Sequence, residues 1–154
     1  MNLRKVHIKV EELKLKKPFV ISRGTRTVIP VILLSITEGN VVGYGECTPS
    51  SRYGETTETE IKKIKKFYIL IENGISRSEL RDKFPACAAR NAIDLALWDL
   101  ELKLEKTSIW KKENKEKPSN LPTAYTISID TAEKMAEEAH LNAHFNLIKI
   151  KLAG

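Results

Sequence analysis

The alternation of hydrophobic and polar residues predicts a small antiparallel sheet in the first third of the chain. Residues 6–10 alternate strictly, as in a half-buried strand, and a β-branched apolar run follows over residues 28–36. The turn at residues 38–40 leads into a third expected strand, 41–46. Short turns favour antiparallel neighbours, so we expect a three-stranded meander. Pro30 has no N–H for a ladder, so the second strand should begin near it or bulge there.

Helical periodicity replaces this alternation in the middle of the chain. Apolar residues recur every three to four positions over Thr57–Ile71, and Asn73-Gly74 ends the pattern. Residues 76–84 predict a short capped helix before a proline. Residues 86–104 carry the strongest helical stripe, and its small alanines permit close packing.

The last third of the chain has the order strand, helix, strand. A β-rich segment covers residues 122–129, a helix over 132–143 is capped by Asp130 or Thr131, and a final strand covers 148–152. This order predicts two parallel strands joined by a crossover helix.

A lysine-rich segment separates these two patterns. Lys111–Lys117 mixes charges of both signs and ends at Pro118, as a solvated linker would. We therefore expect a domain boundary there, with one domain over residues 1–118 and the start of another over residues 119–154.

Composition and charge narrow the possible functions. An apolar share of 42% in 154 residues is enough for a packed core. The net charge of +6 does not indicate nucleic-acid binding, because the densest lysines lie at helical spacing beside apolar residues and no binding signature accompanies them. No apolar run is long enough for a membrane span and residues 1–10 lack a signal-peptide pattern, so we expect a cytoplasmic protein without a membrane partner. Cys47 and Cys87 have no metal or disulfide spacing and are interpreted as reduced packing residues.

Candidate chemistry appears in the final strand, at Lys149-Ile150-Lys151. Because strands repeat every two residues, Lys149 and Lys151 should project from one face. Two like charges in a desolvated cleft would lower a lysine pKa toward that of a general base. A solvated sheet face is the alternative that the pattern alone leaves open.

Four segments occur in the order and spacing of one known family. They are residues 18–26, residues 43–55, residues 88–100, and residues 125–128 followed by Lys149-Ile150-Lys151. Together they resemble the enolase superfamily, and within it the muconate-lactonizing subgroup. The segment ending in Arg26 and the stretch from Glu46 to Glu55 are most similar to its dipeptide epimerases, which act on L-Ala-D/L-Glu.

This resemblance implies an α+β fold, in which an enolase-like N-terminal capping domain, an antiparallel three-stranded meander plus helices, is followed by the first β-α-β of an incomplete TIM barrel. A complete barrel needs about 250 residues and eight strand–helix units. Fewer than two units fit after Pro118, so the resemblance implies a truncated enzyme that is inactive alone.

The resemblance also implies roles for individual residues. Lys151 would be the base that removes the α-proton, and Lys149 would help bind the substrate carboxylate and keep the pKa of the base low. Arg26 would meet an acidic substrate side chain, Thr126 would contact substrate from the first barrel strand, and Tyr53 would bind substrate from a second cap loop. Magnesium would serve the complete family enzyme. No metal site or cofactor is expected for this chain alone, because the acidic ligands and the second catalytic lysine belong to later strands.

Three functions are compatible with the sequence. The first is the N-terminal fragment of a magnesium-dependent dipeptide epimerase. The second is a similarly truncated muconate cycloisomerase or o-succinylbenzoate synthase, and the third is a non-catalytic binding or assembly module derived from the cap. An uncovered final strand predicts an oligomer or a complementing polypeptide, and a completed barrel would bind a small dipeptide.

Overall fold

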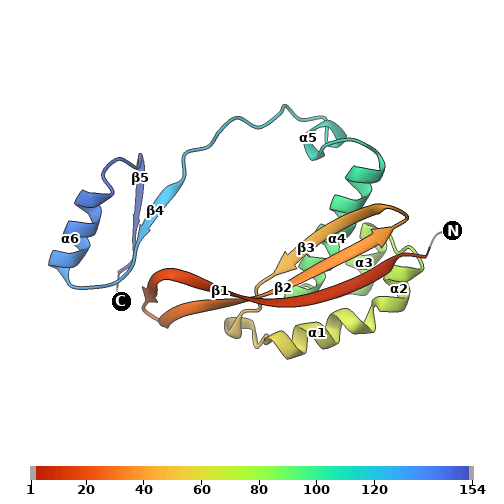
Figure 1. Ribbon diagram of the computed structural model, residues 1–154, viewed down its shortest axis with the longest axis horizontal. Coiled ribbons are helices and arrows are strands. Elements are labelled where there is room, and N and C mark those ends of the chain that lie inside the picture. Colours follow the sequence, from red (N-terminus) through yellow and green to blue (C-terminus); the bar gives the residue numbers. More distant parts are fainter. Residues whose placement is uncertain (1–2, 153–154) are drawn as a thin grey trace. The chain divides into compact units, whose positions relative to one another are not determined.

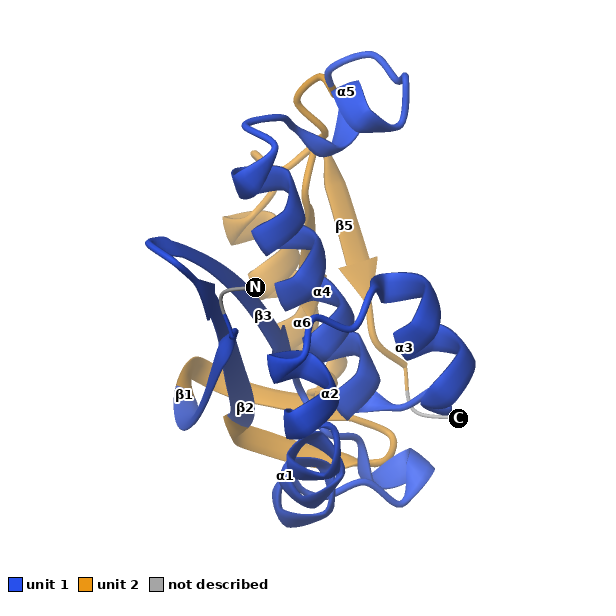
Figure 2. Cartoon of the chain, turned by 90° about the vertical axis from the view of Figure 1, so that its right-hand side faces the viewer, with its two compact units in different colours: residues 1–13, 30–117 blue, residues 14–29, 118–154 orange. Residues whose placement is uncertain are grey.

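The computed structural model describes residues 3–152 (Figure 1). The chain forms two compact units (Figure 2). The first unit contains residues 1–13 and 30–117, and the second contains residues 14–29 and 118–154. Two long strands therefore run through both units.

The expected antiparallel meander is present as the sheet β1-β2-β3, formed by β1 (Lys5–Ile21), β2 (Gly24–Glu38) and β3 (Val41–Cys47). The expected start of β2 near Pro30 is wrong, because Pro30 lies inside that strand. The ladder between β2 and β3 begins at Ile32, so the missing N–H of Pro30 removes no bond to β3.

Helix α4 (Ala88–Leu104) packs directly on β3 because two glycines of that strand carry no side chain. A Cβ on Gly43 would lie 2.2 Å from the carbonyl oxygen of Ala96, and one on Gly45 would lie 2.1 Å from that of Ala92. The glycines of Gly43-Tyr44-Gly45 thus contact the alanine stripe of α4. This contact explains why both segments carry small residues.

The core of the first unit lies between this sheet and its helices. Besides α4, buried side chains come from α1 (Thr57–Lys66), α2 (Tyr68–Glu72) and α3 (Arg77–Lys83), whereas the short α5 (Ile109–Lys112) contributes none. The completely or almost completely buried side chains include Ile32, Leu34, Ile36, Ile64, Ile71, Leu80, Ile93 and Leu100.

The single helix expected over residues 57–71 is wrong, because the chain turns at Phe67 between α1 and α2. The N–H of Phe67 bonds to the carbonyl of Ile64, three residues back, 2.9 Å away. The ring of Phe67 stacks on that of Phe84 with centroids 4.1 Å apart. The turn permits this stacking while Ile64 and Ile71 both stay buried.

Three side chains satisfy the first three N–H groups of α4. Glu55 accepts from Ala88 at 2.9 Å, Glu60 accepts from Ala89 at 2.9 Å, and Cys87 accepts from Arg90 at 3.5 Å. The first-turn donors of a helix have no partner within the helix, so these three side chains together cap α4. Both cysteines are free, as expected, but Cys87 caps a helix as well as packing.

The second unit contains β4 (Ala124–Ile127), α6 (Ala132–Leu141) and β5 (Leu147–Ile150). β4 and β5 pair in parallel, as expected. Of the two expected caps, Thr131 is the N-cap: its hydroxyl accepts from the N–H of Lys134, and Asp130 accepts from the N–H of Thr131. Within residues 3–152, none of the helices has the length and apolar character that crossing a membrane requires.

Candidate functional site

The pair β4–β5 brings three of the predicted site residues together. Its register places Thr126 opposite Lys149, so their side chains leave the same face of the sheet. Lys151 follows directly after β5, and its N–H donates to the carbonyl of Ile127 at 3.0 Å. The two lysines and the threonine therefore lie at the carboxyl end of one parallel strand pair, where barrel enzymes place their catalytic groups.

Both faces of β5 are open. The side chain of Lys149 is exposed and that of Lys151 is half-buried. On the other face, Ile148, Ile150 and Leu152 are 38%, 54% and 76% exposed. The desolvated cleft that a lysine base needs would therefore require further polypeptide over this strand.

The tip of the β1–β2 hairpin, residues 14–29, belongs to the same unit as this strand pair (Figure 2). The N–H of Val20 donates to the hydroxyl of Ser128 at 3.4 Å, and the N–H of Ile129 donates to the carbonyl of Val20 at 3.1 Å. Arg26 is exposed on the β2 arm of this hairpin. The hairpin that carries Arg26 is thus attached to the loop directly after β4.

Tyr53 belongs to the first unit, in the short 3₁₀ helix Ser51–Tyr53, and is 73% exposed. The guanidinium of Arg52 lies 5.9 Å from the centre of its ring. The role of Tyr53 in substrate binding stays a prediction, as do the roles of the two lysines, Arg26 and Thr126.

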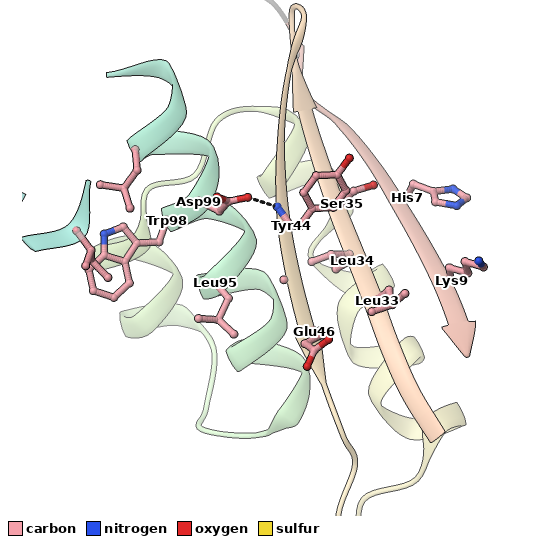
Figure 3. A pocket seen from close by; sticks show the side chains of 13 residues that line it. His7, Lys9, Leu33, Leu34, Ser35, Tyr44, Glu46, Leu95, Trp98 and Asp99 are labelled. Atoms are coloured by element: carbon pink, nitrogen blue, oxygen red, sulfur yellow. Dashed lines mark hydrogen bonds between the residues drawn. The ribbon is translucent and has the colours of Figure 1, made fainter. Parts of the chain in front are cut away.

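A pocket of about 580 Å³ in the first unit is not the site that the sequence predicts (Figure 3). Its walls are mostly apolar and include Leu33, Tyr44, Leu95 and Trp98. Asp99 accepts from the N–H of Tyr44 at 2.8 Å and from a lysine, so its carboxylate is already bound. The lining contains none of the five residues that the sequence predicts for the site.

The described residues do not supply a magnesium site. Over residues 3–152, no three His, Cys, Asp or Glu side chains come together as a ligand group. Mg²⁺ prefers oxygen ligands, above all carboxylates, and the described residues bring no such group of three together.

Sequence reasoning missed Glu138, a carboxylate of the second unit that receives hydrogen bonds from three side chains. It accepts from Lys17, Tyr125 and Asn142. The hydroxyl of Tyr125 first, and then the ammonium of Lys17, hold the pKa of Glu138 below its usual value. The partners lie 121 and 13 residues away along the chain, so no local spacing could have indicated the cluster.

Comparison with known proteins gives the same family for the sequence and the fold. Residues 3–112 match the N-terminal domain of mandelate racemase / muconate lactonizing enzyme. The L-Ala-D/L-Glu epimerase of Escherichia coli K12 is 38% identical over 152 residues, which are 97% of this chain and 47% of that protein.

Solved structures agree. An enolase family member from Agrobacterium tumefaciens, solved with sodium and L-Ala-L-Glu, superposes with a TM-score of 0.90 at 39% identity, over 96% of this chain and 45% of that one. The dipeptide epimerase of Enterococcus faecalis, solved with magnesium and L-Leu-L-Tyr, gives a TM-score of 0.85 at 28% identity, over 100% and 46%.

The chain spans about half the length of the curated relatives it matches. The expected fold is confirmed, with an enolase-type capping domain followed by the start of a second, parallel sheet. The resemblance to dipeptide epimerases is also confirmed. The chain belongs to the mandelate racemase / muconate lactonizing enzyme family of the enolase superfamily, and it corresponds to the N-terminal part of its relatives.

Proposed function

We propose that this chain provides the capping domain and the first barrel strands of a dipeptide epimerase, and that it needs the remaining barrel to act. The observation that carries the proposal is the β4–β5 register, with Thr126 opposite Lys149 and Lys151 at the strand end. The 38% identity to an L-Ala-D/L-Glu epimerase supports the substrate class.

In this proposal the neutral amine of Lys151 removes the proton from the carbon next to the substrate carboxylate. The ammonium of Lys149 binds that carboxylate, and Arg26 pairs with the side-chain carboxylate of a glutamyl residue, since a guanidinium fork matches a carboxylate. Return of a proton on the opposite face completes the epimerisation. The group that returns it, and the groups that stabilise the enediolate charge, would come from polypeptide beyond the described residues.

The test is a chimera in which this chain is joined to the part of the Escherichia coli epimerase that follows the matched region. Wild-type chimera with magnesium should convert L-Ala-L-Glu to L-Ala-D-Glu and exchange the α-proton in deuterated water. Lys151→Ala should lower kcat by about 10²–10⁴-fold, the usual contribution of a general base. Lys66→Ala, at an exposed lysine of α1, is the matched control and should leave the rate unchanged.

A folded chimera without activity, or one in which Lys151→Ala keeps full activity, would contradict the proposal. Substrate choice is tested separately with L-Leu-L-Tyr. The wild-type chimera should prefer L-Ala-L-Glu, and Arg26→Leu should reduce that preference, because an unpaired substrate carboxylate loses its partner.

A further inference from the structure

Glu138 joins three segments of the second unit that are distant in sequence. Its carboxylate accepts two hydrogen bonds from the ammonium of Lys17, at 2.9 and 3.0 Å, and one from the hydroxyl of Tyr125. The side-chain amide of Asn142 lies 3.4 Å from the same carboxylate. Lys17 is on the hairpin tip, Tyr125 is on β4, and Glu138 is on α6. We call these four residues the Glu138 cluster.

Main-chain contacts reinforce this connection at a second point. Val20, three residues after Lys17, exchanges hydrogen bonds with Ser128 and Ile129 just after β4. The hairpin, β4 and α6 together line a pocket of about 740 Å³. The hairpin tip is therefore attached to the first strand–helix unit both by its backbone and through the Glu138 cluster.

The chemistry of the cluster favours one geometry. The side chain of Glu138 is 24% exposed, so its carboxylate has lost much of its water and depends on protein donors. Lys17 is 70% exposed, and an exposed ion pair alone contributes little. The phenol and the ammonium reach one carboxylate from different elements. Because each hydrogen bond strengthens the others, together they fix the relative position of these elements.

We propose that the Glu138 cluster is a positioning device that holds the hairpin tip carrying Arg26 on the first strand–helix unit, and thereby sets how the substrate side chain is bound. The role in substrate binding rests on the proposed function. Glu138 itself does not touch the reacting atoms. Tyr125 precedes Thr126 in β4, so the cluster lies beside the strand residue predicted to contact substrate.

The first experiment uses the chain as it is and measures hydrogen exchange. Glu138→Gln keeps the side-chain size but removes the charge, so exchange in peptides covering residues 14–29 and 124–131 should become about three- to tenfold faster. Protection in residues 30–117 should not change. Glu137→Gln is the matched control, because this exposed carboxylate is the neighbouring residue on the same helix and no described residue forms an ion pair with it.

Milder variants keep the test decisive if Glu138→Gln unfolds the whole second unit. Tyr125→Phe removes only the phenol donor, and Lys17→Met removes only the ammonium. Each should speed exchange at residues 14–29. When either is combined with Glu138→Gln, the effects should be less than additive, because all three residues share one interaction.

The second experiment uses the active chimera and separates KM from kcat. Loss of the cluster should raise KM for L-Ala-L-Glu about three- to tenfold and leave kcat nearly unchanged, because the hairpin binds substrate and transfers no proton. KM for L-Leu-L-Tyr, which has no acidic side chain, should change much less. Glu138→Asp should partly restore the wild-type KM.

The outcomes separate this proposal from the proposed function. If the wild-type chimera is inactive, the proposed function fails, and hydrogen exchange in the chain alone decides whether the cluster holds the hairpin. Two results would overturn the proposal that the Glu138 cluster holds the hairpin. One is unchanged hydrogen exchange at residues 14–29 in all three variants, and the other is an equal acceleration of that exchange in Glu137→Gln. Faster exchange with an unchanged KM in an active chimera would overturn its role in substrate binding.

Discussion

Replacing Gly45 with alanine tests the close packing of α4 on β3. The added Cβ would lie 2.1 Å from the carbonyl oxygen of Ala92 and 2.7 Å from the main-chain nitrogen of Ala96. Both are backbone atoms of α4, so no side-chain rotation can relieve the overlap. Restoring an ordinary separation of 3.4 Å or more requires the helix to move by more than about 1 Å away from β3.

We expect Gly45→Ala to lower the free energy of unfolding of the first unit by about 3 kcal/mol or more, the upper range for overpacking a core. Urea titration followed by tryptophan fluorescence is suited to this measurement, because both tryptophans, Trp98 and Trp110, lie in the first unit. Glu46→Ala, at an exposed position of the same strand, is the control and should change stability by no more than about 0.5 kcal/mol. A Gly45→Ala protein within that range of wild type would refute the packing argument.

Three further predictions concern titratable groups. Burial raises the pKa of Glu60, but hydrogen bonds from a lysine and a main-chain amide outweigh burial and leave the pKa below 4.5. The ionised carboxylate of Glu60 therefore stabilises the fold above pH 4.5, and this stabilisation is lost as the pH falls through the lowered pKa. Glu60→Gln should therefore be less stable than wild type at pH 7 in urea titration, and the difference should shrink in acid; a constant difference would contradict this. Burial raises the pKa of Cys47 to about 12, so roughly one Cys47 thiol in ten thousand is ionised at pH 8. Mass spectrometry should therefore show that iodoacetamide labels Cys47 only after unfolding, whereas the less buried Cys87 is labelled in the native protein. Hydrogen bonds from Tyr125 and a lysine lower the pKa of Glu138 below 4.5. The hydrogen-exchange protection factors of residues 14–29 should therefore be constant above pH 4.5 and fall in more acidic solution. The same loss of protection in a Glu138→Gln protein would show that another group causes it.

Features that depend on local sequence could be predicted. Ser76 begins α3 through a capping box, and Thr131 caps α6, because a hydroxyl three residues before a free N–H needs no distant partner. The parallel pairing of β4 and β5 followed from the strand–helix–strand order, since a crossover helix returns the chain in the same direction.

Features that depend on distant contacts could not be predicted. The hairpin arms over residues 14–29 are largely exposed and show no apolar alternation, so no local pattern indicated that β1 extends to Ile21 or that β2 starts at Gly24. The turn at Phe67 depends on a ring, Phe84, that lies 17 residues further along the chain. Of the candidate site, the sequence predicted Thr126, Lys149 and Lys151 as candidates but not Glu138. The partners Lys17 and Tyr125 of that carboxylate come from two other elements, β1 and β4.

The division of β1 and β2 between the two units has a consequence for modularity. A cut at the linker near Pro118 would not separate the units cleanly, because residues 14–29 would remain with the cap while β4 and α6 were removed. The hairpin would then lose the hydrogen bonds that Val20 forms with Ser128 and Ile129, and also the ion pair between Lys17 and Glu138. Transfer of this hairpin from one relative to another should therefore succeed only when the hairpin, β4 and α6 are moved together, although the cap separates them in sequence.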